Sequence, residues 1–149
     1  MSVKKEAVIK MQRYCAYQER CHSEVRNKLI ALKVYGDDLE YVITELIKED
    51  FLNEQRYAET YSGGKFRIKK WGKQKIKKNL KAKMVSEYCI NKGLAVIDDD
   101  EYSKTLNTLI KKYRKERKNK DWTKLEMNKK CIQFCQNKGY EYFQIKEFL

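Results

Sequence analysis

Lysine and arginine side chains are the residues whose type and spacing could do chemistry in this chain, and that chemistry is the binding of phosphate groups. Residues 65–83 hold ten basic residues and no acid, and residues 111–120 hold seven basic residues and one acid, Glu116. Clustered Lys and Arg attract phosphates and release counterions when they bind them. Faces that only keep a helix solvated usually mix both signs of charge. The two blocks therefore predict a polyanion partner, and a solvated helix face remains the alternative.

The candidate partner-binding and nucleic-acid-binding residues lie in these two blocks. They are Lys65, Arg67, Lys69, Lys70, Lys73, Lys75, Lys77, Lys78 and Lys81 in the first block, and Lys111, Lys112, Arg114, Lys115, Arg117 and Lys118 in the second. We expect Lys69, Lys70, Lys73, Lys77, Lys78 and Lys81 to be central. Phe66 and Trp71 interrupt the first block. Such aromatic residues either stack on nucleic acid bases or pin a helix to its neighbour, and their place beside a helix start favours the second role.

The net charge of +13 is unevenly distributed. Residues 1–60 carry 10 basic and 11 acidic residues, whereas residues 61–149 carry 24 basic and 10 acidic residues. The positive surface is therefore expected on the second and third parts of the chain, with the first part as a support or a protein-contact arm.

Catalytic and metal-binding residues are not expected. The chain has five Cys, one His and no Cys-x-x-Cys pair. Cys131 and Cys135 lie four residues apart and His22 follows Cys21, so a metal site is conceivable, but free Cys commonly packs as a small apolar side chain. No Ser/His/Asp or Cys/His set and no phosphate-cradling glycine loop can be assembled. We therefore expect no enzyme activity, no cofactor and no metal.

Targeting signals are also not evident in the sequence. The first ten residues lack the apolar stretch of a signal peptide, and no run approaches the roughly 18 apolar residues of a membrane span. An odd number of Cys favours free thiols in a reducing compartment. The expected location is the cytoplasm, without membrane association.

The elements that position the basic residues are predicted to be helices in a threefold repeat. A helix ending in a long apolar residue, followed by a Lys-rich turn, occurs at Leu29, Leu80 and Phe134, at intervals of 51 and 54 residues. The absence of Pro and the six Gly agree with an all-α chain. The pattern predicts a single chain, 1–149, forming an elongated array of three tandem three-helix repeats at 5–50, 53–97 and 98–149. The alternative is one helix-turn-helix domain with additions.

Several helix ends can be predicted from capping residues. Ser23 is expected to cap the second helix, Asp37 the third with Glu40 in a capping box, and Asn53 to open the fourth. The pair Gly63-Gly64 is expected to interrupt that fourth helix. Asp98 to Asp100 favour the start of the seventh helix, because acidic residues suit the positive end of the helix dipole.

Five segments resemble the RecX family of regulatory proteins. The first three are Glu24–Leu29, the helix ending in Leu46, and residues 49–59 (Glu-Asp-Phe-Leu-Asn-Glu-Gln-Arg-Tyr-Ala-Glu). Gly72 followed by Ile76, Leu80, Lys83 and Val85 resembles the motif of the family's second repeat, and Lys138-Gly139-Tyr140 that of its third. The likeness covers about residues 8–149, and residues 49–59 are its most specific part. The chain departs from the family pattern at Met84, where Gly is usual, at Cys21, where Ser is common, and at Gly63-Gly64.

This resemblance implies a curved tandem of three-helix repeats that acts as a non-enzymatic modulator of the RecA recombinase. Family members bind the RecA–single-stranded DNA filament and suppress its ATP hydrolysis and strand exchange, in the regulation of DNA repair and recombination. The expected partners are therefore the RecA filament and, by weak direct contact, single-stranded DNA, with the protein as a monomer. Two other functions stay open: a free-standing nucleic-acid-binding protein, and a helical-repeat adaptor for another acidic protein.

Overall fold

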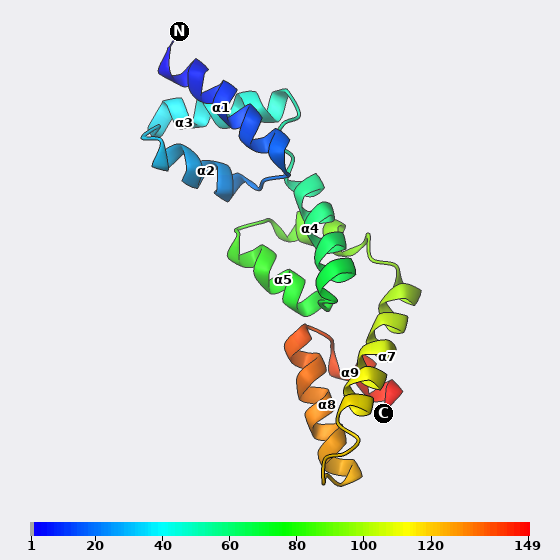
Figure 1. The fold of residues 1–149 in the computed structure, drawn as a ribbon. Helices are drawn as coiled ribbons and strands as arrows, with labels where there is room; N and C mark the ends of the chain where they lie inside the picture. Colours follow the sequence, from blue (N-terminus) through cyan, green and yellow to red (C-terminus); the bar gives the residue numbers. More distant parts are fainter. Residues whose placement is uncertain (1) are drawn as a thin grey trace. The chain divides into compact units, whose positions relative to one another are not determined.

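The computed structural model describes residues 2–149, and these residues form nine α-helices, a terminal 3-10 helix and no strand (Figure 1). The α-helices are α1 (Val3–Tyr17), α2 (His22–Ala31), α3 (Gly36–Lys48), α4 (Glu54–Lys69), α5 (Lys73–Ala82), α6 (Glu87–Leu94), α7 (Asp99–Glu116), α8 (Lys124–Lys138) and α9 (Tyr142–Ile145). The 3-10 helix η1 spans Lys146–Phe148. The predicted all-α fold class is confirmed.

The helices divide into two compact units. The first unit combines the chain up to Tyr61 with Leu80–Gly93, and the second combines Ser62–Asn79 with Leu94–Leu149. Helices α4 and α5 are each shared between the units. The predicted repeats at 5–50, 53–97 and 98–149 follow a different division of the same helices, and these boundaries stay a prediction.

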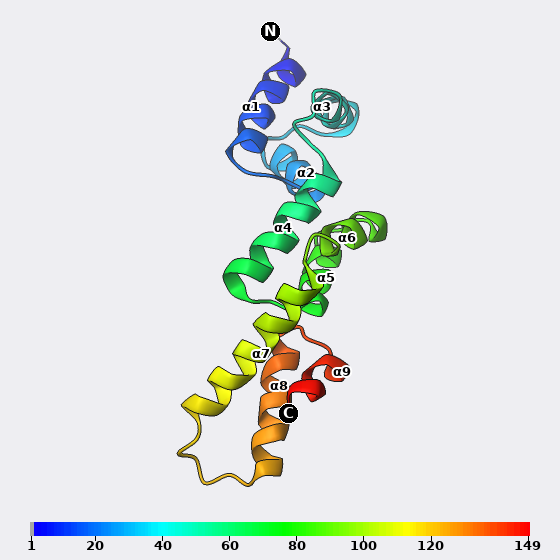
Figure 2. The ribbon, with the colours of Figure 1, turned by 90° about the vertical axis from the view of Figure 1, so that its right-hand side faces the viewer.

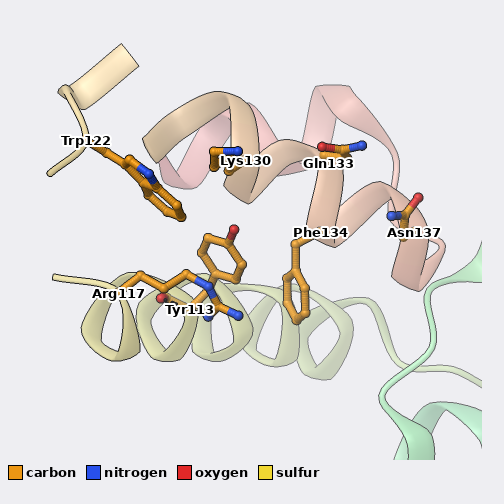
Figure 3. Close-up of a pocket in the computed structure, with 7 residues that line it drawn as sticks. All are labelled: Tyr113, Arg117, Trp122, Lys130, Gln133, Phe134 and Asn137. Carbon is orange, nitrogen blue, oxygen red and sulfur yellow. Dashed lines mark hydrogen bonds between the residues drawn. The ribbon is translucent and has the colours of Figure 1, made fainter. Parts of the chain in front are cut away.

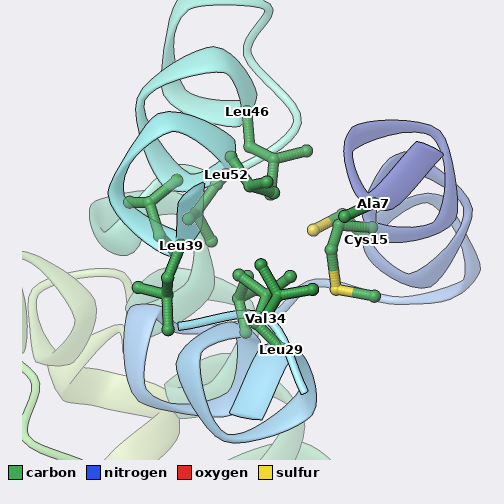
Figure 4. Close-up of a cluster of buried hydrophobic side chains, with 11 residues drawn as sticks. Ala7, Cys15, Leu29, Val34, Leu39, Leu46 and Leu52 are labelled. Atoms are coloured by element: carbon green, nitrogen blue, oxygen red, sulfur yellow. The ribbon is translucent and has the colours of Figure 1, made fainter. Parts of the chain in front are cut away.

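The core of the first unit lies between α1, α2 and α3 (Figure 4). Helix α3 places Leu39, Val42, Ile43 and Leu46 on one face, because residues three and four apart align along a helix. These side chains are at most 6% exposed and pack with Met11 of α1 and Leu29 of α2, among others. Helices α1 and α3 make the most extensive contact in this unit. Apolar spacing in the sequence thus accounts for this core.

Two helix starts in the first unit differ from the predicted ones. Helix α2 is capped by Cys21, whose N–H donates to the Glu24 carboxylate at 3.0 Å. The predicted cap Ser23 was wrong, because its hydroxyl donates instead to the carbonyl of Lys83 at 2.7 Å. Helix α3 begins at Gly36 without a side-chain cap, so the prediction for Asp37 was also wrong. Asp37 lies in the first turn, where its charge suits the helix dipole.

Helix α4 begins as predicted but is not interrupted by its glycine pair. The Asn53 side chain accepts a hydrogen bond from the Arg56 N–H at 2.9 Å, which caps the helix. The helix then continues through Gly63-Gly64 to Lys69. A glycine inside a helix costs only about 1 kcal/mol relative to alanine, and the burial of the Phe66 ring, which is 4% exposed, offsets that cost.

In the second unit α7 and α8 lie side by side, with α9 beside α8 (Figures 1 and 2). Helix α7 starts as predicted, with the Asp98 carboxylate accepting the Glu101 N–H at 3.0 Å. Leu106 and Ile110 of α7 and Cys131 and Cys135 of α8 are fully buried. The two cysteines therefore pack as small apolar side chains. Residues 2–149 contain no group of three His, Cys, Asp or Glu that could hold a metal ion.

None of the helices formed by residues 2–149 combines the length and the apolar character that crossing a bilayer requires. Even α7, which at 18 residues is the longest of them, carries charged residues in both its first and its last turns.

Four helices end in a residue with left-handed backbone geometry that is not glycine. Lys33, Asp50, Lys70 and Met84 follow α2, α3, α4 and α5 and have φ between 60° and 63°. A side chain costs roughly 1–2 kcal/mol in this conformation, whereas glycine adopts it freely. Met84 stands where the family pattern has glycine, so its backbone is strained in a conformation that glycine would adopt without strain.

Replacing Met84 by glycine is expected to stabilise the protein by about 1 kcal/mol. The Met84 side chain is 81% exposed, so almost no apolar burial is lost. Urea unfolding followed by circular dichroism measures the change. The variant Met84→Ala keeps a Cβ atom and should show no such gain. A lower free energy of unfolding for Met84→Gly would contradict the assigned backbone strain.

Candidate polyanion-binding interface

The turn between α4 and α5 carries the centre of the first basic block and is held by backbone groups of residues 138–140. The N–H of Gly72 donates to the Lys138 carbonyl at 2.7 Å, and the N–H of Gln74 donates to the Gly139 carbonyl at 2.9 Å. The hydroxyl of Tyr140 donates to the Lys70 carbonyl at 2.9 Å. The first donors of α5 and the last acceptors of α8, which a helix leaves unpaired, thereby satisfy one another. The carbonyl of Lys70, directly after α4, is satisfied by the Tyr140 hydroxyl.

Two glycines allow this close approach. A Cβ atom on Gly72 would lie 2.3 Å from the carbonyl carbon of Gly139 and 2.5 Å from the nitrogen of Tyr140. A Cβ atom on Gly139 would lie 2.5 Å from the Cβ of Lys75. Gly139 also has φ +105°, and it ends α8 in the left-handed conformation. The backbones at these positions touch directly, so neither glycine can carry a side chain without displacement.

Buried aromatic rings support the turn from within the second unit. Tyr102 of α7 lies between Phe66 and Tyr140, with ring centroids 5.7 and 5.0 Å apart, respectively. The Tyr102 hydroxyl accepts the N–H of Lys73 at 2.8 Å. Burial raises the pKa of Tyr102 to about 12, even though this N–H lowers it, and burial also raises the pKa of Tyr140. Both phenols stay protonated at neutral pH, so Tyr140 remains a donor to the turn.

The two aromatic residues of the first basic block have different surroundings. Phe66 is 4% exposed and pins α4 to α7, as predicted. Trp71 is half-buried, and the ammonium groups of Lys65 and Lys75 lie 5.0 and 4.5 Å from its ring centroid. Cation–π attraction of this kind is worth about 0.5–1 kcal/mol at exposed sites. Trp71 therefore orients two of the predicted site residues.

The predicted residues of the first block fall into two groups by exposure. Arg67, Lys69, Lys70, Lys78 and Lys81 are exposed, whereas Lys65, Lys73, Lys75 and Lys77 are half-buried. Lys73 is drawn inward because its ammonium lies 4.9 Å from the Tyr102 ring and 3.6 Å from the Asp99 carboxylate. The exposed group is the part of the block that offers charge to a partner.

The second block differs from the prediction at its two arginines. Lys111, Lys112, Lys115 and Lys118 are exposed, and Lys112 lies 4.0 Å from Glu116. Arg114 instead donates to the Asn128 side chain at 3.0 Å, and Arg117 lies 3.8 Å from the Tyr113 ring centroid. Both arginines lie four residues after a buried residue, Ile110 and Tyr113, and so share the inward face of α7. The predicted single basic face is therefore a row of lysines without the arginines.

The arrangement suits the binding of anions. Exposed ammonium groups lie at the C-terminal end of α4, along α5 and along α7. The backbone of the α4–α5 turn is fixed by hydrogen bonds to residues 138–140. Lys111 and Lys115, one turn apart on α7, present a spacing that can follow a phosphate backbone or a row of carboxylates. Direct phosphate contacts of this type position a protein on nucleic acid without reading its sequence.

An all-α protein with a fixed, lysine-rich turn is the class defined by this fold and surface. The family model described as "RecX, second three-helix domain" matches residues 53–94. The chain is 32% identical over 123 residues to "Regulatory protein RecX" of Clostridium perfringens (strain 13 / Type A), an alignment that covers 83% of this chain and 57% of that protein. It is 30% identical over 132 residues to "Regulatory protein RecX" of Lactococcus lactis subsp. lactis (strain IL1403), covering 87% and 48%.

Solved structures agree with these relatives. The fold superposes on "Crystal structure of RecX from Lactobacillus salivarius" with a TM-score of 0.88 and 25% identity, covering 97% of this chain and 93% of that one. The chain belongs to the RecX family. It spans 57% and 48% of the length of the two relatives named above. The predicted family is confirmed.

Sequence reasoning did not identify the residues that hold the basic turn in place. Tyr102 was expected only as part of an apolar stripe, and Lys138-Gly139-Tyr140 only as the third copy of a motif. The structure brings that third copy against Gly72 of the second copy. The signal was present, because both segments carry a glycine next to a Lys-rich turn, but the sequence does not show which copies meet.

Proposed function

We propose that this protein binds the RecA recombinase filament on single-stranded DNA and inhibits its ATP hydrolysis and strand exchange, in the regulation of DNA repair and recombination. The observation that carries the proposal is the lysine-rich α4–α5 turn, whose backbone is fixed while its side chains are exposed. The family relatives named "Regulatory protein RecX" support a regulatory role. In this proposal the protein acts by binding alone, as a monomer in the cytoplasm, without a cofactor.

A fixed cationic surface suits a nucleoprotein filament for a physical reason. Such a filament presents phosphates and acidic protein side chains over a long distance, and each exposed lysine that meets one releases a counterion. Because the α4–α5 turn is ordered beforehand, little conformational entropy is lost when it binds. Weak direct contact with single-stranded DNA is part of the proposal.

The experiment that tests the function is a RecA ATPase assay on single-stranded DNA with this protein titrated in. We expect ATP hydrolysis to fall in a saturable manner as the protein concentration rises. The same titration with the DNA omitted controls for effects on RecA that do not need the filament. Unchanged hydrolysis at a several-fold excess of this protein over RecA would remove the proposal.

The second candidate function is a free-standing nucleic-acid-binding protein, which the net charge of +13 favours. Binding to bare single-stranded DNA at several salt concentrations separates the two functions. Tight binding that weakens steeply with salt, in the absence of any recombinase, favours this second function. Weak binding that becomes tight only when RecA coats the DNA favours the proposed one.

A further inference from the structure

A groove between α7 and α8 brings aromatic rings, amides and cations together away from the α4–α5 turn. It has a volume of about 350 Å³ and is lined by Tyr113, Arg117, Trp122, Lys130, Gln133, Phe134 and Asn137. Figure 3 shows Trp122 from the loop before α8, Tyr113 from α7 and Phe134 from α8 projecting toward one another. Small-molecule sites begin at about 300 Å³, so the groove has room for a group the size of a nucleotide.

The aromatic walls are partly open. Tyr113 and Phe134 are in contact, with ring centroids 4.8 Å apart at 33°, and they form one side of the groove. Trp122 and Phe134 are half-buried, so part of each ring faces solvent. A half-exposed tryptophan next to a tyrosine–phenylalanine pair offers a flat surface that binds another flat ring by stacking.

The polar lining is suited to a nucleotide more than to an apolar ligand. Lys130, Gln133, Phe134 and Asn137 lie at positions i, i+3, i+4 and i+7 of α8 and so share one face. The side chains of Gln133 and Asn137 are exposed, and their side-chain amides make no hydrogen bond to any other residue among 2–149. Free amides of this kind offer both a donor and an acceptor to the edge of a base.

Two cations border the aromatic rings. The Lys130 ammonium lies 5.2 Å from the Trp122 ring centroid, and the Arg117 guanidinium lies 3.8 Å from that of Tyr113. Arg117 also lies 3.6 Å from Glu116, but no carboxylate lines the groove itself. A ring stacked in this groove would therefore have positive charge beside it, where the phosphate of a nucleotide would lie.

We infer that this groove binds one nucleobase of single-stranded nucleic acid, with stacking on Trp122, amide contacts from Gln133 and Asn137, and the phosphate near Lys130 and Arg117. The inference rests on the proposed function, because that function brings the protein to single-stranded DNA. It adds a second contact, distinct from the lysine-rich turn, which depends on bases as well as on charge. An aromatic side chain of an acidic partner protein is the competing occupant.

Fluorescence quenching of Trp122 tests the inference. The chain has two tryptophans, so Trp71→Phe leaves Trp122 as the only indole. We expect a short oligo(dT) to quench this fluorescence in a saturable manner, and a deoxyribose-phosphate strand of equal length without bases to leave it nearly unchanged. Equal quenching by both strands would overturn the inference, since charge alone would then account for binding. A competition experiment compares two competitors against bound, labelled oligo(dT): unlabelled oligo(dT) and an aspartate-rich peptide that contains tryptophan. If the peptide displaces the bound strand at a lower concentration than unlabelled oligo(dT) does, the inference is also overturned.

A variant pair measures the contribution of the stacking. In the wild-type chain, Trp122→Ala should weaken binding of oligo(dT) about tenfold or more and leave binding of the base-free strand unchanged. Trp122→Phe retains a ring and should keep most of the affinity, which separates stacking from loss of fold. The matched control is Tyr142→Ala, because Tyr142 is an exposed aromatic residue that also pairs with a lysine, Lys146, at 5.9 Å. An equal loss from Tyr142→Ala would overturn the inference.

The groove and the proposed function fail in different ways. If Trp122 is not quenched but the protein still inhibits RecA ATP hydrolysis, only the nucleobase groove is wrong. If Trp122 is quenched by oligo(dT) and ATP hydrolysis is unaffected, only the recombinase proposal is wrong.

Discussion

Reversing the charge of Lys69, Lys70, Lys78 and Lys81 to Glu is expected to abolish inhibition of RecA ATP hydrolysis. These are the exposed members of the six lysines expected to be central, so their loss removes charge without removing core contacts. Each lysine that meets a phosphate on single-stranded DNA contributes about 0.7 to the salt dependence of binding, so four lost contacts reduce that slope by about 3. The half-inhibitory concentration should rise about a hundredfold or more.

Folding should survive this substitution, because residues 65–83 hold ten basic residues and no acid, and fewer positive charges reduce their mutual repulsion. Circular dichroism should show unchanged helicity. The matched control reverses Lys5, Lys10, Arg13 and Lys33, four exposed residues of the first unit. It lowers the net charge from +13 by the same 8, to +5, and it includes Lys33, which shares the left-handed backbone of Lys70.

The control variant should inhibit RecA almost as well as the parent protein. Equal loss of inhibition in both variants would show that inhibition depends on the total charge of the protein and not on the positions of Lys69, Lys70, Lys78 and Lys81. Full inhibition by the Lys69, Lys70, Lys78 and Lys81 variant would refute the assignment of this surface.

Gly72→Ala is expected to lower the free energy of unfolding by about 3 kcal/mol or more. The new Cβ would lie 2.3 to 2.5 Å from three backbone atoms of Gly139 and Tyr140, and backbone cannot rotate away as a flexible side chain can. The two backbone segments, at residues 72–74 and 138–140, must therefore move apart, which stretches the hydrogen bonds from Gly72 to Lys138 and from Gln74 to Gly139. Urea unfolding followed by circular dichroism measures the loss.

Gly64→Ala is the matched control for this substitution. Gly64 lies in the interior of α4, and an added Cβ atom there meets nothing within 4 Å. Alanine is the better helix former, so we expect this variant to gain about 0.5–1 kcal/mol. If Gly72→Ala unfolds at the same urea concentration as the parent, the direct backbone contact between the α4–α5 turn and the end of α8 is refuted.

Much of the secondary structure could be predicted because helix-forming signals here are local. Apolar spacing and the absence of proline predicted an all-α chain, and capping by Asn53 and Asp98 is confirmed. The failures involve competition from distant residues. The Ser23 hydroxyl donates to the carbonyl of Lys83, sixty residues away. The burial of Phe66 against Tyr102 of α7 favours a continuous α4. The curvature of the array and the three repeat boundaries stay predictions.

The candidate surface could be predicted only in part, for a related reason. Charge counts identify where lysines are concentrated, and the structure exposes most of them. They do not show which basic side chains turn inward, as Arg114 and Arg117 do through contacts with Asn128 and Tyr113. The groove beside Trp122 was not predicted at all, because its walls come from a loop and two helices that only tertiary packing brings together.

The contact between Gly72 and Lys138 also sets an order of events during synthesis. The two residues are 66 positions apart, and the carbonyls of Lys69 and Lys70 receive their donors from Lys138 and Tyr140. Chains are made from the N-terminus, so the lysine-rich turn exists as a flexible segment until almost the whole of this sequence has been translated. A nascent chain therefore carries the positive charge of this candidate surface before residues 138–140 are present to fix its backbone.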